Sequence, residues 1–341
     1  MKRFGIICDG GDAPGINAVI RAVSRAAFEK GHEVFGFVDG FEGLIKNDVK
    51  IVTKQTVSGI LNQGGSVLGI SRVNPFGDPK HIGSIKENFK RNSLTLLILI
   101  GDRDTVVIAK KLSEEGIPSL VIPKTIDNDV YGTDFTIGFD TAVSTISAAL
   151  DSLHATASTH HRLMVVETMG RETGWLALFG GIAGGADYIV IPEVPYELSE
   201  IAAHIEKRRN EGKNFSIIVV AEGTKLPAEI ESKIEKDEFG HPVSGKRMIG
   251  YYMASELEKL TNIKARTTVL GYTQRGGVPT TTDRILAIRL GVQAVDLANK
   301  GVFNGVVGIK GSEIIFTPLE ESASRVHMAD TEYLSLAKIF F

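Results

Sequence analysis

Short, continuously apolar runs alternate with segments of helical period along nearly the whole chain. Apolar runs of strand length occur at residues 4–8, 34–38, 94–100, 119–122, 163–167, 188–191, 216–221, 267–270 and 306–309. Helical patterns lie between most of them, at 16–28, 105–115, 141–153, 198–211, 253–260 and 282–298. Strands that are apolar throughout are typical of parallel sheets covered by helices on both faces. The sequence therefore predicts an α/β fold with ligands bound at the carboxyl ends of strands.

Composition limits the classes of function. The chain has 341 residues, of which 43% are hydrophobic and 23% charged, enough for two domain-sized cores. A net charge of −3 gives no support for nucleic-acid or membrane-surface binding, and one cysteine excludes an internal disulfide. No apolar run has the length of a signal or membrane-spanning segment, so we expect a cytoplasmic protein. We expect it to bind neither nucleic acid nor a membrane. The most polar stretch, 225–248, is expected to be a surface excursion.

Three predicted strand ends carry residues suited to phosphate chemistry. The first, CDGGDAPGIN at 8–17, has glycines that let the backbone approach an anion at a helix start. The second, GGSVLGISR at 64–72, ends in Arg72, whose planar fork can clamp phosphate oxygens. The third, VIPKTIDND at 121–129, combines a lysine with two aspartates, as phosphoryl transfer to a hydroxyl requires. Each alone is also compatible with an ordinary tight turn.

Three later strand ends repeat this pattern. VVETMGRETGW at 165–175 supplies Arg171, VVAEGT at 219–224 supplies Glu222, and VLGYTQRGGVPTTTDR at 269–284 supplies Arg275. Singly, each of these charges is explained by exposure to solvent in a turn. Six such loops, all at strand ends and all mixing glycine with cations and carboxylates, favour a phosphate-binding protein.

The motifs GGDAPGIN, GGSVLGISR, PKTIDND, FDTA, MGR, AEG and GYTQRGG, in this order and spacing, resemble the 6-phosphofructokinase family, most closely its pyrophosphate-dependent bacterial branch. The resemblance extends from residue 1 to about 309. It implies two three-layer α/β domains with mostly parallel sheets. The phosphoryl-donor domain would comprise 1–138 and about 275–326, and the sugar-phosphate domain 139–274 and about 327–341. It also implies a homotetramer, or a dimer.

The resemblance assigns roles to individual residues. Asp127 would take the proton from the 1-hydroxyl of fructose 6-phosphate, Asp129 would help hold Mg²⁺, and Lys124, Asp104 and Arg171 would join Asp127 in catalysis. Substrate-binding residues would be Thr125, Asp127, Arg162, Met169, Gly170, Arg171, Glu222, Arg266, Tyr272 and Arg275. Arg162 and Arg266 would reach in from a neighbouring chain. Donor-binding residues would be Gly11, Arg72, Asp104 and Lys124.

Two positions of the motif bear on the phosphoryl donor. ATP-using members generally have glycine where this chain has Asp104 and Lys124, and charged residues there are typical of pyrophosphate users. A carboxylate at 104 would repel the α-phosphate of a nucleotide, and a lysine at 124 would neutralise the small leaving phosphate. We therefore expect pyrophosphate rather than ATP, and Tyr272 replaces a histidine common in ATP users.

The segment GDRDT at 101–105 departs from the resemblance. Relatives have glycine at the position of Asp102 and a metal-holding acid at that of Arg103, and they have a small serine at that of Asp9. In one interpretation Asp9 or Asp102 takes over the metal and Arg103 contacts donor phosphate. In a second, Arg103 pairs with these aspartates and closes the pocket, since a guanidinium cannot lose its charge and repels magnesium. In a third, Arg103 points to solvent.

Two functions follow from these interpretations. The first is an enzyme that transfers phosphate from pyrophosphate to fructose 6-phosphate with Mg²⁺. The second is an impaired homologue that binds sugar phosphate or regulates, because of Asp102 and Arg103. An ATP-dependent member remains a further alternative.

Overall fold

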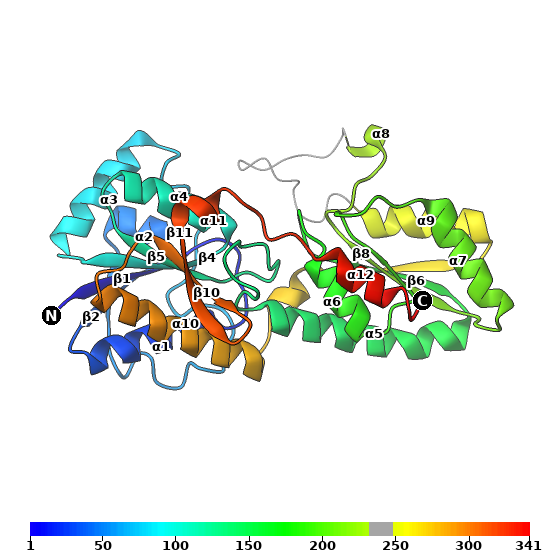
Figure 1. The fold of residues 1–341 in the computed structure, drawn as a ribbon, viewed down its shortest axis with the longest axis horizontal. Coiled ribbons are helices and arrows are strands. Elements are labelled where there is room, and N and C mark those ends of the chain that lie inside the picture. Colours follow the sequence, from blue (N-terminus) through cyan, green and yellow to red (C-terminus); the bar gives the residue numbers. More distant parts are fainter. Residues whose placement is uncertain (232–247) are drawn as a thin grey trace. The chain divides into compact units, whose positions relative to one another are not determined.

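The computed structural model describes residues 1–231 and 248–341, so most of the polar stretch 225–248 lies outside the described residues. The described chain divides into two compact units. The first comprises Met1–Thr141 and Arg275–His327, and the second Ala142–Gln274 and Met328–Phe341. The predicted fold class, two α/β domains with mostly parallel sheets, is confirmed (Figure 1).

The first unit is built on a seven-stranded sheet. Its strands are β1 (Arg3–Cys8), β2 (Glu33–Phe37), β3 (Val49–Val52), β4 (Leu96–Gly101), β5 (Ser119–Pro123), β10 (Gly305–Lys310) and β11 (Glu313–Pro318). They lie in the order β11-β10-β5-β4-β1-β2-β3, with parallel pairs inside and antiparallel edge strands β3 and β11. The chain moves from β1 to β2 on one side and then to β4 on the other. This change of direction opens the sheet edge between the loops that follow β1 and β4.

Helices cover both faces of this sheet. On one face lie α1 (Ile16–Glu29) and α10 (Thr281–Asn299), and on the other α2 (Phe41–Lys46), α3 (Pro79–Arg91), α4 (Arg103–Glu114) and α11 (Leu319–Ala323) (Figure 1). Helix α1 packs on the sheet because it has one apolar stripe. This stripe is fully buried and consists of Ile16, Val19, Ile20 and Val23. Burying each such side chain stabilises the fold by roughly 1.5–3 kcal/mol.

The second unit has a four-stranded, wholly parallel sheet. Strands β6 (Leu163–Thr168), β7 (Tyr188–Val190), β8 (Ser216–Ala221) and β9 (Ala265–Val269) lie in the order β7-β8-β6-β9. Its helices are α6 (Trp175–Ala183), α7 (Leu198–Asn210), α8 (Ala228–Glu231), α9 (Ile249–Thr261) and α12 (Thr331–Ala337), with α5 (Phe139–His160) and the short 3₁₀ helix η1 (Gly271–Arg275) starting or ending at its boundary. Helices α7 and α9 share one apolar core with the sheet.

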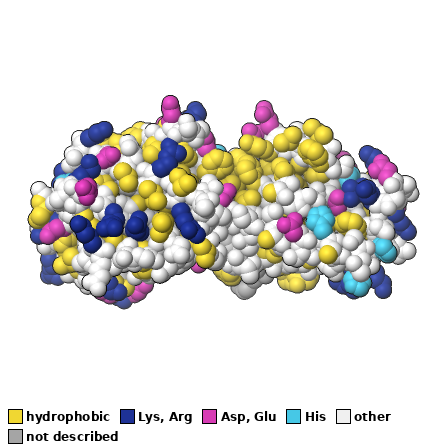
Figure 2. Space-filling model, turned by 90° about the horizontal axis from the view of Figure 1, so that it is seen from below, with side chains coloured by type: hydrophobic (Ala, Val, Ile, Leu, Met, Phe, Trp, Pro, Cys, Tyr) yellow, Lys and Arg dark blue, Asp and Glu magenta, His cyan; other side chains and the backbone are white. Residues whose placement is uncertain are grey.

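Several elements carry no clear periodic signal in the sequence. Helix α6, WLALFGGIA, is apolar on nearly all sides, so it lacks the polar face that marks an amphipathic helix. Edge strands β3 and β11 are short or partly exposed and therefore lack a continuous apolar run. Of the described helices, none is long and apolar enough to cross a lipid bilayer. Figure 2 shows Lys and Arg side chains interspersed with acidic and apolar ones on the visible face of each unit.

Candidate functional site

Three adjacent strands of the first unit bring the predicted donor residues together. Strands β5, β4 and β1 are parallel neighbours, so the loops that follow them meet at one edge of the sheet. The N–H of Asp9 donates to Ile100 O (3.0 Å), and the N–H of Lys124 donates to Gly101 O (2.8 Å). We call the segments that follow these strands, 9–15, 102–105 and 124–129, the donor loops.

The carboxylate of Asp102 binds two donor loops together. Its Oδ2 accepts from the N–H of Gly11, and its Oδ1 accepts from the N–H of Thr105, each at 3.3 Å. Asp102 thereby caps the N-terminus of α4, where the helix dipole favours negative charge. Main-chain N–H groups in a glycine-rich turn and at a helix start are also the groups that bind phosphate oxygens in proteins.

A second carboxylate, that of Asp9, also contacts Thr105. Asp9 is 4% exposed, and its Oδ2 accepts a hydrogen bond from the hydroxyl of Thr105 (2.8 Å). Burial, with a further contribution from the charge of Asp102, raises the pKa of Asp9 to about 7. Asp9 is therefore poised between its neutral and ionised forms near neutral pH.

Lys124 is fully buried under the glycine-rich turn. Its Nζ donates to the main-chain oxygens of Asp9 (2.7 Å) and Gly11. Burial lowers the pKa of Lys124, while the charges of Asp102 and Asp9 oppose that change. An ammonium has three N–H donors, and two of them hold the turn in place here. Asp104 lies half-buried in the first turn of α4.

Arg103 is half-buried, and its charge acts on Asp129. Burial, followed by the charges of Asp127 and Asp102, raises the pKa of Asp129 to about 8, and Arg103 opposes that rise. Which of the three interpretations of Arg103 holds stays a prediction.

The donor loops can be tested for a fit to magnesium. The described part of the chain contains no group of three or more His, Cys, Asp or Glu side chains that could hold a metal ion. However, Mg²⁺ commonly takes one or two carboxylates and completes its shell with water and phosphate oxygens. Asp129 has a buried Oδ1 without a hydrogen-bond partner, and Asp127 is its neighbour in the same loop. This pair fits a magnesium ion that arrives with a phosphate ligand.

Two predicted arginines flank the glycine-rich turn. Arg275 is buried in the first unit, with its Nη1 3.8 Å from Asp12 Oδ1, and a Cβ on Gly11 would lie 3.3 Å from the same nitrogen. Arg72 is exposed and follows Ser71, which pairs with Asp9 in an isolated parallel bridge. The resemblance assigns Arg275 to the sugar phosphate, and that role stays a prediction.

In the second unit, the loops after β6 and β8 are locked together; with the loop after β9 we call them the acceptor loops. The N–H of Glu222 donates to Thr168 O (2.8 Å), and the N–H of Gly223 donates to Gly170 O (2.9 Å). A Cβ on Gly223 would lie 1.9 Å from Arg171 O, so only glycine fits. Gly170 adopts a φ of 124°, which L side chains rarely adopt. The predicted residues Met169, Gly170, Arg171 and Glu222 thus form one rigid edge.

Gln274 joins the third acceptor loop to this edge. Its fully buried side chain accepts from the N–H of Met169 (3.3 Å) and donates to Gly271 O (3.0 Å). Tyr272, on the same 3₁₀ helix η1, is 64% exposed. Gln274 lies within the motif GYTQRGG, but a glutamine that supports the loop and one that binds a ligand look the same in the sequence.

Arg162 and Arg266 lie away from the acceptor loops. Arg162 directly precedes β6, whereas Met169 follows its last residue, a separation of about 23 Å at 3.3 Å per residue. Arg266 is exposed on β9 opposite Met164, and its Nη1 donates back to Ala265 O (2.7 Å). Arg162 therefore lies at the opposite end of β6 from the acceptor loops.

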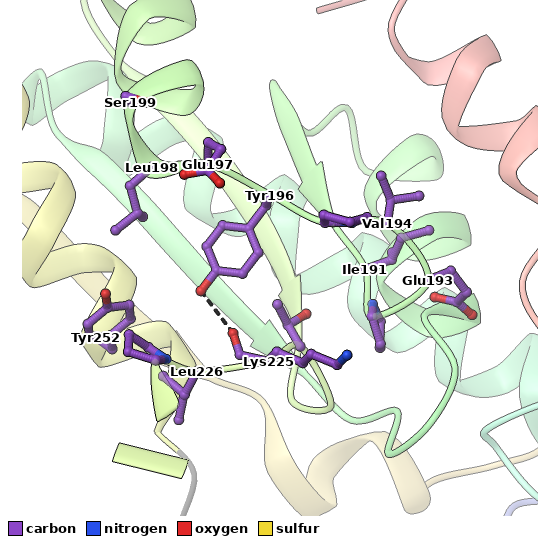
Figure 3. Close-up of a pocket in the computed structure, with 14 residues that line it drawn as sticks. Ile191, Glu193, Val194, Tyr196, Glu197, Leu198, Ser199, Lys225, Leu226 and Tyr252 are labelled. Atoms are coloured by element: carbon purple, nitrogen blue, oxygen red, sulfur yellow. Dashed lines mark hydrogen bonds between the residues drawn. The ribbon is translucent and has the colours of Figure 1, made fainter. Parts of the chain in front are cut away.

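A separate cavity of about 580 Å³ opens beside the acceptor loops in the second unit (Figure 3). The segments after β7 and β8 line it together with Tyr252 of α9. Inside it, the hydroxyl of Tyr196 donates to Lys225 O (3.0 Å). Its wall contains none of the predicted site residues, so we assign it no part in the chemistry.

The fold and the two sets of loops define the class of protein: an α/β phosphotransferase with cations, carboxylates and main-chain N–H groups at its strand ends. The profile of the family described as Phosphofructokinase matches residues 3–298. The chain therefore belongs to the phosphofructokinase family, as the motifs predicted.

Individual relatives extend this finding over the whole chain. A pyrophosphate--fructose 6-phosphate 1-phosphotransferase of Dictyoglomus thermophilum is 41% identical over 342 residues, which cover 99% of this chain and 98% of that protein. An ATP-dependent 6-phosphofructokinase of Corynebacterium efficiens is 44% identical over 344 residues, 99% of each. The crystal structure of Pichia pastoris phosphofructokinase in the T-state matches with a TM-score of 0.84 and 30% identity, over 99% of this chain and 36% of that longer one.

Proposed function

We propose that this protein transfers a phosphoryl group from pyrophosphate to the 1-hydroxyl of D-fructose 6-phosphate, giving fructose 1,6-bisphosphate and phosphate. The names of the relatives support the acceptor, because both kinds of relative act on fructose 6-phosphate by name or family. Overall identity does not choose the donor, since the pyrophosphate-named and ATP-named relatives are 41% and 44% identical. The choice rests on the donor loops.

The observation that carries the donor choice is the position of the Asp102 carboxylate. It takes the N–H groups of Gly11 and Thr105, so fewer main-chain donors remain for phosphate oxygens. Asp104, half-buried in the first turn of α4, adds a second negative charge. A carboxylate at 104 would crowd and repel the α-phosphate that a nucleotide has and pyrophosphate lacks, which favours pyrophosphate over a nucleoside triphosphate.

In the proposed step, the Asp127 carboxylate takes the proton of the 1-hydroxyl. The hydroxyl oxygen then forms a bond to the terminal phosphorus of pyrophosphate, and the bridging P–O bond breaks with its electron pair on the leaving phosphate. Lys124, Arg72 and Arg171 offset negative charge on the transferred group. Asp129, beside Asp127, would hold Mg²⁺, which when bound neutralises charge on the phosphates.

Sugar-phosphate recognition is the proposed role of the acceptor loops. Met169, Gly170, Arg171 and Glu222 form a rigid edge, and Thr125, Tyr272 and Arg275 would complete the binding set. Arg162 and Arg266 would serve a neighbouring chain in a homotetramer or dimer. The separation along β6 supports this proposal, because Arg162 lies at the end of the strand opposite to Arg171.

The direct test is turnover with pyrophosphate and, separately, with ATP. We expect kcat/KM to be at least tenfold higher with pyrophosphate, a difference of about 1.4 kcal/mol. The double variant Asp104→Gly, Lys124→Gly should shift the donor preference, measured as the ratio of the two kcat/KM values, toward ATP. The matched control is Lys111→Gly with Glu114→Gly at the exposed far end of α4, which should leave the preference unchanged. An enzyme that uses only ATP, or neither donor, refutes the proposal.

A second candidate, an impaired sugar-phosphate-binding or regulatory homologue, is supported by Arg103, a half-buried cation at the position where relatives have a metal-holding acid, whose charge acts on Asp129. In that case calorimetry should detect fructose 6-phosphate binding without pyrophosphate or magnesium binding. The double variant Arg103→Glu, Asp102→Gly reintroduces the residue types of relatives at both positions. It should then raise turnover sharply. Efficient turnover by the unmodified protein would exclude this candidate.

A further inference from the structure

Asn128 stands between the two carboxylates of the third donor loop in an uncommon conformation. Its φ is 54°, in the left-handed region, where asparagine is one of the few non-glycine residues tolerated. Its side chain is fully buried, accepts from the N–H of Thr136 (2.8 Å) and donates to Asp134 O (3.0 Å). These bonds tie the loop to residues 134–136.

The same loop is also held by His327, on the segment that follows α11. The ring Nδ1 of His327 lies 2.8 Å from Asn128 O, and the N–H of His327 donates to Asp129 O (3.0 Å). A carbonyl oxygen only accepts, so Nδ1 carries the proton in this contact. An isolated antiparallel bridge between Val130 and Val326 continues the pairing.

This contact controls a peptide plane next to both carboxylates. The Asn128 carbonyl belongs to the peptide that leads into Asp129, and the N–H on the other side of Asn128 belongs to the peptide that follows Asp127. A change of that plane would rotate the directions in which the two side chains leave the loop. Displacement of a reacting group by about 1 Å can lower a rate roughly 100-fold.

We propose that His327 is a positioning residue, which fixes the Asp127–Asp129 loop through the main-chain oxygen of Asn128. The proposal deepens the proposed function and rests on it, because it presumes that the carboxylates of this loop act in phosphoryl transfer. It does not depend on any change in the charge of His327.

Two variants separate the hydrogen bond from the bulk of the ring. His327→Leu removes the side-chain donor, whereas His327→Asn keeps an N–H donor at nearly the same distance from the backbone. Arg325→Ala is a matched control on the same segment, because the hydrogen bond of Arg325 goes to the hydroxyl of Tyr131 (2.6 Å), outside the third donor loop. We expect His327→Leu to lower kcat by roughly tenfold or more with little change in either KM. His327→Asn should keep kcat within about threefold of the unmodified protein.

Hydrogen exchange at residues 125–130, read by mass spectrometry on the full chain, is measured in parallel. We expect faster exchange there in His327→Leu than in the unmodified protein, His327→Asn or Arg325→Ala. Unchanged exchange in His327→Leu overturns the inference, and so does unchanged kcat in an active enzyme. If the unmodified protein uses neither donor, the proposed function fails, and the exchange result alone decides whether His327 positions the loop.

Discussion

The main-chain nitrogen of Gly11 donates a 3.3 Å hydrogen bond to Oδ2 of Asp102, so a side-chain anion lies directly on the glycine-rich turn. The fit is close, because a Cβ on Gly10 would lie 2.2 Å from the same oxygen. The turn also has a left-handed φ of 79° at Gly10. Asp102 thus holds a place on this turn that suits a phosphate oxygen.

Removing the Asp102 charge should therefore strengthen donor binding. Asp102→Ser keeps a side-chain oxygen that can cap α4 but removes the charge. We expect the KM for pyrophosphate to fall by roughly tenfold, equivalent to about 1.4 kcal/mol, because a repelling carboxylate is gone. Steady-state kinetics at saturating fructose 6-phosphate measures this change.

Asp102→Ala separates the cap from the charge. It should lower KM to a similar degree but also reduce the free energy of unfolding by about 1 kcal/mol, the usual value of an N-cap. A KM that stays the same or rises in both variants would show that Asp102 does not compete with the donor.

The position of the donor loops could be predicted from sequence. The apolar runs predicted as strands end at residues 8, 100 and 122, within one residue of the ends of β1, β4 and β5. Asp9, Asp102 and Lys124 directly follow these strands, and parallel strands bring their carboxyl ends to one edge. The same reasoning placed Arg171 and Glu222 at one edge of the second sheet. Strand period and the residue after each strand were sufficient in these cases, because both are local in the chain.

Contacts between distant segments could not be predicted in this way. His327 lies 199 residues from Asn128, and no periodicity links them. The burial of Lys124 was also unexpected, because a lysine in a charged loop is normally exposed. Its burial follows from the two carbonyls of the glycine-rich turn, whose direction depends on backbone angles rather than on side-chain pattern.

Protein stability should depend on the titration of Asp9. Its pKa is about 7 in the folded protein and near 3.8 when unperturbed, so the folded state binds the proton more tightly between about pH 4 and pH 7. The free energy of unfolding therefore falls as pH rises through this window. Asp9→Asn cannot bind that proton. The free energy of unfolding, measured by urea unfolding at pH 5, 6 and 7, is plotted against pH for the unmodified protein and for Asp9→Asn. The two slopes should differ by up to about 1.4 kcal/mol per pH unit. Parallel curves would contradict the assignment.

Asp283 should be a strong determinant of stability. Its buried carboxylate accepts from the N–H of Gly138 (2.9 Å), and from the N–H (2.9 Å) and hydroxyl (2.5 Å) of Thr141 at the start of α5. Asp283→Ala leaves these donors without their acceptor and should cost roughly 3 kcal/mol. Asp296→Ala on the same helix removes only a partly exposed ion pair with Lys30 and should cost at most about 1 kcal/mol. Equal losses by thermal unfolding would refute the distinction.

Mixing two inactive variants should restore activity if binding sites are shared between chains. Arg162→Ala removes the arginine proposed to serve a neighbouring chain, and Arg171→Ala removes the one that serves its own. In a symmetric pair formed from one chain of each kind, one site keeps both arginines and the other loses both. Random mixing after reversible dissociation should therefore return about a quarter of the unmodified activity. Arg162→Ala mixed with itself through the same procedure is the control and should stay inactive. If activity does not recover although mass spectrometry demonstrates mixed oligomers, both arginines would act in the binding site of their own chain.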